Sequence, residues 1–159
     1  MKNTKTLLSI FLLFAISVFT VSCSKEGPVY EKYLKMKNST WDRFDQKYFE
    51  IQVDDISKSF DITFVVRVTT KLAYDEIPFY LILTTPAGEE RIRELKIPVR
   101  ENGKMVGELK GNIYETRVDL WKEISISTKG KCKISIENLI PIIQTEGIDE
   151  IGIVVTKSK

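Results

Sequence analysis

The stretch "FDITFVVRV", residues 60–68, alternates apolar and polar side chains with a period of two. In an extended chain, successive side chains point to opposite faces. One face therefore carries the apolar residues Phe60, Ile62, Phe64, Val66 and Val68, and the other carries Asp61, Thr63 and Arg67. This pattern predicts a β-strand with one buried side.

Turn sequences separate further runs of this kind. "TPAGEE" (85–90) suits a type I turn and predicts direct pairing of "FYLILT" (79–84) with "RIRELKIPV" (91–99). "ENGK" (101–104) contains Asn-Gly, a strong hairpin signal, and "TKGK" (128–131) predicts that "EISIS" pairs with "CKISIE". With "YFEIQV" and "EIGIVVT", the pattern predicts an all-β fold, a single antiparallel β-sandwich (jelly-roll or immunoglobulin-like) of about seven or eight strands over residues 40–159.

The first 22 residues have the features of a secretory signal. Lys2 and Lys5 precede an apolar run that is shorter than the roughly 20 residues that a transmembrane helix needs. The residues before Cys23 resemble the lipobox of bacterial lipoproteins, in which the cysteine becomes the lipidated amino terminus. We therefore expect a lipoprotein signal peptide over residues 1–22, lipid attachment at Cys23 and a lipidated tether over residues 23–39. Ordinary cleavage that leaves a free thiol is the alternative.

The second cysteine, Cys132, alternates with Ile134 and Ile136 on one face of a predicted strand. This position favours a small, buried core residue. A disulfide between Cys23 and Cys132 is the alternative, but it would join a polar terminus to the interior of a strand. We expect the lipid-bearing chain to have no intramolecular disulfide.

Composition excludes several classes of function. The chain has no histidine and only two cysteines, so Ser-His-Asp catalysis and histidine- or thiolate-based zinc sites are excluded. Without Lys2 and Lys5, 22 basic side chains face 22 acidic ones, which argues against a nucleic-acid partner. Paired acids such as Asp54-Asp55 fall in turns and give only a weak signal for calcium or glycoside chemistry. We expect no enzyme activity, no metal and no cofactor.

Two groups of side chains are candidates for an interaction surface. Trp41, Tyr114 and Trp121 could stack on sugar rings, although capping the ends of the core is the favoured interpretation for the tryptophans. The segment "NLIPIIQTEG" (138–147) carries apolar residues without a period of two. We expect it to form a lid that buries Ile142 and Ile143, and the alternative is that these two residues form an exposed docking patch.

Several short motifs, taken in order, resemble the GldH family of gliding-motility lipoproteins from about Trp41 to Thr156. They are Trp41 itself, Ile77-Pro78-Phe79, Gly103-x-x-x-Gly107, Leu120-Trp121-Lys122-Glu123, Ile136-Glu137-Asn138 and Gly147-Ile148-x-x-Ile151-Gly152. The resemblance implies an envelope lipoprotein that is needed for surface gliding and acts beside the machinery that secretes and moves adhesins. It supplies no catalytic residues.

The sequence therefore predicts a non-catalytic protein that is lipid-anchored to the outer membrane, on its periplasmic or its surface face. Its partners would be the membrane and other envelope proteins of a motility or secretion apparatus. A surface glycan-binding β-sandwich module is the alternative. Exposure of the aromatic rings distinguishes the two, because a glycan platform needs open ring faces.

Overall fold

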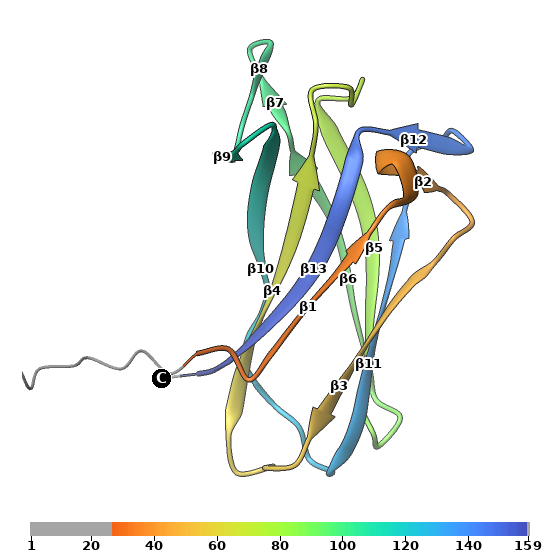
Figure 1. The fold of residues 1–159 in the computed structure, drawn as a ribbon. Helices are drawn as coiled ribbons and strands as arrows, with labels where there is room; N and C mark the ends of the chain where they lie inside the picture. Colours follow the sequence, from red (N-terminus) through yellow and green to blue (C-terminus); the bar gives the residue numbers. More distant parts are fainter. Residues whose placement is uncertain (1–26, 159) are drawn as a thin grey trace, which may run out of the picture.

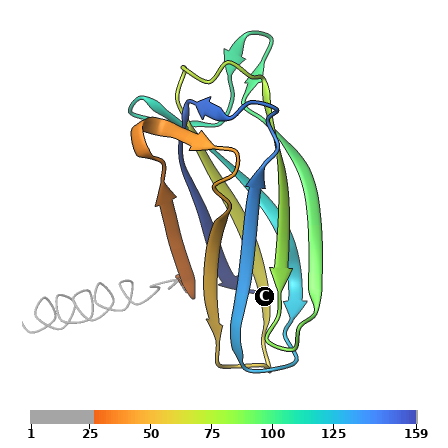
Figure 2. The ribbon, with the colours of Figure 1, turned by 90° about the vertical axis from the view of Figure 1, so that its right-hand side faces the viewer.

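The structure is a computed structural model that describes residues 27–158. Two antiparallel sheets face each other and enclose the core (Figures 1 and 2). The five-stranded sheet contains, in spatial order, β1 (Tyr30–Lys35), β13 (Ile148–Lys157), β4 (Ser59–Val68), β10 (Ile113–Ser125) and β9 (Glu108–Lys110). The four-stranded sheet contains β3 (Lys47–Val53), β11 (Gly130–Asn138), β5 (Glu76–Thr84) and β6 (Glu90–Pro98).

Two small sheets lie at one end of the molecule, at the top of Figure 1. One pairs β2 (Thr40–Asp42) with β12 (Gln144–Glu146), and the other pairs β7 (Arg100–Glu101) with β8 (Lys104–Met105). We call this end apical and the opposite end basal. The prediction of an all-β, antiparallel, sandwich-like fold is confirmed. The predicted number of strands, seven or eight in a single sandwich, is wrong. Within residues 27–158 there are thirteen strands in four sheets, because short strands at the ends carry too few residues to show a periodicity.

The stretch 60–68 forms most of β4, at the centre of the five-stranded sheet. Phe64, Val66 and Val68 are buried in the core, as their alternation predicts. Phe64 contacts Phe79 of the opposite sheet edge-to-face, with ring centroids 5.1 Å apart. This contact joins the two layers, since each ring fills space that the other sheet's face leaves open.

Two of the predicted hairpins are confirmed. The turn between β5 and β6 closes with a hydrogen bond from the Gly88 N–H to the Thr85 carbonyl, 3.0 Å long. Between β7 and β8, Asn102 and Gly103 both have positive φ, 50° and 76°, as an Asn-Gly hairpin requires.

The predicted hairpin around Gly130 is wrong. β10 pairs with β4 and β9, whereas β11 pairs with β3 and β5. The connection over residues 126–129 therefore crosses from one sheet to the other. Its turn-forming residues suit a tight reversal and a crossover equally well, so local sequence did not distinguish the two.

The predicted tether over residues 23–39 also needs correction, because its second half is folded. β1 pairs along its length with β13, and residues 37–39 form a 3-10 turn. Tyr30 and Leu34 pack against the core and Met36 is buried, while the charged residues between them point outward. The lysines and glutamate of "YEKYLK" obscured this strand. The predicted signal peptide and Cys23 lie outside the described residues.

Candidate interaction surface at the apical end

The segment 138–147 is half lid and half exposed surface. Ile140 is buried, with 1% of its surface exposed, and closes the apical end of the core. Ile142 and Ile143 are exposed, at 39% and 65%. The expectation that the lid buries these two residues is therefore wrong. After Pro141 the chain turns outward to pair with β2, which leaves their side chains outside the core.

Hydrogen bonds hold this segment in place. The buried Asn138 side chain accepts from the Ile140 N–H at 3.0 Å and donates to Thr145 Oγ1 at 3.1 Å. The Arg43 N–H donates to the Ile143 carbonyl at 2.8 Å and so extends the pairing of β2 with β12. The exposed isoleucines thus lie on a segment that is held at both ends, by the bond to the Ile140 N–H and by the bond to the Ile143 carbonyl.

An exposed aromatic side chain stands on the neighbouring backbone segment. Phe44 is 80% exposed and sits in the turn that follows β2. Its N–H donates to Asp42 Oδ1 at 2.9 Å, and the Asp45 N–H donates to the Asp42 carbonyl at 3.0 Å. Because Arg43 bonds to Ile143, Phe44 stands on the backbone segment next to the two isoleucines. We call Phe44, Ile142 and Ile143 the apical patch.

The aromatic residues singled out from the sequence do not join this patch. Trp41 is fully buried, packs on Phe79 with ring centroids 5.8 Å apart and donates from its indole N–H to the Asp45 carbonyl at 2.8 Å. Trp121 is 8% exposed, and Tyr114 is partly buried against the core. Neither tryptophan offers an open ring face for a sugar. The favoured prediction that the tryptophans belong to the core is confirmed.

Phe44 was missed by the sequence analysis. A phenylalanine near Trp41 and the alternating Tyr48 and Phe49 is typical of a core, and Phe49 is indeed fully buried. The available signal was Asp42. An aspartate side chain often accepts a hydrogen bond from the N–H two residues further along the chain and so forms a turn. A turn at this point places Phe44 outside the sheets.

A row of charged side chains crosses the outer face of the five-stranded sheet. Glu115 of β10 accepts hydrogen bonds from Arg67 at 2.7 Å, Lys110 at 2.8 Å and Arg117 at 2.8 Å. Arg67 also pairs with Glu150 of β13, and its guanidinium lies 4.2 Å from the centre of the Tyr33 ring of β1. The row thus includes a residue from every strand of this sheet.

Glu115 is the buried centre of this row, with 1% of its side chain exposed. Burial alone would raise the pKa of its carboxyl, but the hydrogen bonds from Lys110, Arg67 and Arg117 lower the pKa to about 2. The carboxylate is thereby kept charged at physiological pH. Three cationic side chains already donate to this carboxylate, so the arrangement suits a structural clamp across the strands rather than acid–base catalysis.

The described residues contain little that would suggest metal or thiol chemistry. Within residues 27–158, no group of three or more His, Cys, Asp or Glu side chains is placed to hold a metal ion. Cys132 is a free, buried thiol, as predicted, and burial raises its pKa. No helix in the same range is both long and apolar enough to cross a membrane.

Comparison with known proteins gives one decisive match. The model of the GldH lipoprotein family matches residues 28–155, which is most of the chain and nearly all of the folded domain. The chain belongs to the GldH lipoprotein family. GldH membership associates it with gliding motility and with a lipid-anchored place in the cell envelope, and the family is not known for an enzyme activity.

The other comparisons add little to the GldH assignment. No curated protein matches. Among solved structures, infectious bursal disease virus, Gx strain, is similar at 13% identity and a TM-score of 0.36, covering 82% of this chain and 30% of that one. An uncharacterised protein of Listeria monocytogenes is similar at 16% identity and a TM-score of 0.32, covering 69% and 8%. Both likenesses are too slight to inform fold or function, and the chain spans under a third of either protein.

Proposed function

We propose that this GldH-family protein is a non-catalytic docking protein of the cell envelope. It would be held at the outer membrane by lipid on Cys23 and would bind another envelope protein of the motility or secretion apparatus through the apical patch. The observation that carries the proposal is the exposure of Phe44, Ile142 and Ile143 on backbone fixed by hydrogen bonds.

The positions of the anchor and the patch support this proposal. Val29 donates its N–H to the Val155 carbonyl at 2.8 Å, so the described chain begins at the basal end, near the end of β13 (Figure 1). Cys23 is only six residues before Val29. β13 has ten residues and spans about 33 Å at ~3.3 Å per residue. A lipid at the basal end would leave the apical patch about 30 Å away and free to meet a partner.

The chemistry of the patch is also suited to docking. Aromatic side chains such as that of Phe44 are enriched at protein interfaces, and the two isoleucines add apolar area that docking would bury. Ordered backbone lowers the entropy lost on binding, because fewer torsions have to be fixed. The glycan-binding alternative has lost its proposed platform, since Trp41 and Trp121 are buried.

Site-specific crosslinking in intact cells tests the docking function. A photoactivatable amino acid at position 143 should yield an adduct with one envelope protein, and Phe44→Asp in the same chain should abolish that adduct. Ile92 of β6, which is 54% exposed and lies in a different sheet, is the matched control position. An identical adduct pattern from positions 143 and 92, or an adduct unaffected by Phe44→Asp, would contradict the proposal.

The anchor is tested separately. Cys23→Ala should give a precursor that is not processed and takes up no labelled fatty acid, whereas the parent is labelled and fractionates with the outer membrane. Equal labelling of the two proteins would show that Cys23 is not the lipid-bearing residue.

A further inference from the structure

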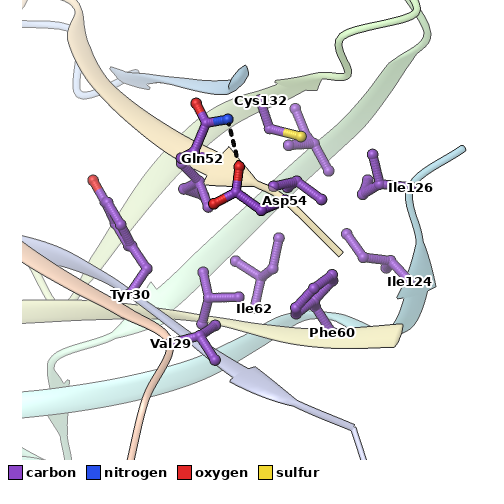
Figure 3. A pocket seen from close by; sticks show the side chains of 13 residues that line it. Val29, Tyr30, Gln52, Asp54, Phe60, Ile62, Ile124, Ile126 and Cys132 are labelled. Atoms are coloured by element: carbon purple, nitrogen blue, oxygen red, sulfur yellow. Dashed lines mark hydrogen bonds between the residues drawn. The ribbon is translucent and has the colours of Figure 1, made fainter. Parts of the chain in front are cut away.

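A cavity of about 230 Å³ lies between the two large sheets at the basal end (Figure 3). Its apolar lining comes from both sheets and includes Phe60, Ile62, Leu83, Ile124, Cys132 and Val155. Val29 and the exposed pair Gln52 and Asp54 also line it, and Gln52 Nε2 donates to Asp54 Oδ1 at 2.9 Å. Val29 is 47% exposed, so this side of the cavity meets the solvent.

The size and lining of the cavity favour an apolar occupant. An engineered apolar cavity of about 150 Å³ stays dry and binds benzene, and this one is larger. At roughly 30 Å³ per water-sized group, it would hold on the order of seven or eight methylene groups. That volume fits the end of an aliphatic chain.

One lining residue carries a polar group without a partner. The hydroxyl of Tyr30 is buried and has no hydrogen-bond partner within the described part of the chain. Burial, and then the charge of Glu50, raises the pKa of this hydroxyl, so it remains a protonated donor at neutral pH. In Figure 3 this hydroxyl points away from the other labelled side chains, so the apolar lining, and not the hydroxyl, favours an aliphatic chain as the occupant.

We propose that the cavity receives the end of one acyl chain from the lipid on Cys23 of the same molecule. This inference rests on the proposed lipidation. Cys23 precedes Val29 by six residues, and six residues span at most about 20 Å when extended. The anchor is therefore within reach of the cavity opening. An acyl chain held there would fix the basal end against the membrane and would orient the apical patch away from it.

Magnetic resonance of the full lipidated protein tests the proposal. Cells are fed a carbon-13-labelled fatty acid, the protein is purified in deuterated detergent, and mass spectrometry first establishes the lipid on Cys23. We expect nuclear Overhauser contacts from labelled acyl protons to the methyl groups of Ile62, Leu83 and Val155. Cys132→Phe, which fills the cavity, should abolish these contacts. Ile92→Phe, which introduces the same residue at an exposed position of β6, should preserve them.

Each other outcome has a defined meaning. Contacts that reach only exposed methyl groups, such as those of Ile56, or that persist in Cys132→Phe, overturn the proposal. So do cavity contacts from labelled fatty acid added to the Cys23→Ala protein when the attached lipid gives none, because the occupant is then a free lipid. An unmodified Cys23 in the mass spectrum would instead refute the proposed anchor.

A second measurement applies even where Cys132→Phe does not fold. A ligand that binds only the native state raises the melting temperature. In the same detergent, the lipidated protein should therefore melt at a higher temperature than the full-length Cys23→Ala chain. Equal melting temperatures would overturn the proposal.

Discussion

The two ends of the sandwich use apolar side chains in opposite ways. At the apical end, Phe44 and Ile143 are exposed although a hydrogen bond holds the backbone of each. At the basal end, Ile62 and Leu83 are buried but face a cavity that they do not fill. Burial and packing are therefore separate properties of a side chain. One end presents apolar side chains on hydrogen-bonded backbone, and the other keeps space between buried side chains, so each end suits a different kind of partner.

The largest expected effect tests whether the stability of the apical end depends on the buried indole ring of Trp41. Trp41→Ala removes a fully buried indole and the hydrogen bond to the Asp45 carbonyl. We expect a loss of about 3–5 kcal/mol in the free energy of unfolding, measured by urea denaturation, because the cavity left behind relaxes only partly. Phe44→Ala, three residues away, is the control and should cost under ~0.5 kcal/mol. Similar costs for the two would show that the distinction between buried support and exposed patch is wrong.

The second effect concerns the sheet that connects the two ends. The pKa of Glu115 is lowered from its ordinary 4.5 to about 2, which corresponds to about 3 kcal/mol of stability at neutral pH. A carboxyl with a lowered pKa stabilises the fold above pH 4.5, and this contribution is lost as the pH falls toward 2. We expect Glu115→Gln to be less stable at pH 7 by about that amount and to approach the parent near pH 2.

The matched control for this pH dependence is Glu108→Gln on β9. Glu108 belongs to the same row of charges but is mostly exposed, and its ion pair with Lys110 is 3.4 Å long. Exposed pairs contribute little, so its stability curve should follow that of the parent within ~0.5 kcal/mol at every pH. If Glu108→Gln lost as much acid-dependent stability as Glu115→Gln, the buried centre of the row would not be the source of the effect.

A third change would loosen the apical segment without touching the patch. Asn138→Ala removes the side chain that bonds to both Ile140 and Thr145, and leaves a buried N–H and a buried hydroxyl without these partners. Its cost should be about 1–3 kcal/mol by thermal denaturation. Amide hydrogen exchange should accelerate over residues 139–146 and remain unchanged in β3 and β11 near the basal cavity. Uniform acceleration would mean that the two ends do not unfold separately.

The sequence predicted local features of the chain much better than contacts between distant segments. The alternation in residues 60–68 and the turns at Gly88 and Asn102-Gly103 are local properties of the chain, and the structure confirms them. The crossing at residues 126–129 and the pairing of β1 with β13 depend on contacts between distant segments, which no local pattern contains. The exposure of Ile142 was missed for the same reason, since it depends on where β2 lies.

The smallest expected effect decides between the two accounts of the apical segment. If Ile142 were part of a buried lid, Ile142→Glu would bury an unpaired carboxylate and unfold the domain. At 39% exposure, however, the new carboxylate can reach water while Ile140 still closes the core. We therefore expect the midpoint of thermal unfolding to change by the equivalent of less than ~0.5 kcal/mol. Ile140→Glu is the matched variant two residues earlier, and it should unfold the domain because Ile140 is 1% exposed. A cooperative loss of structure in Ile142→Glu would contradict the exposed patch and would return this residue to the core.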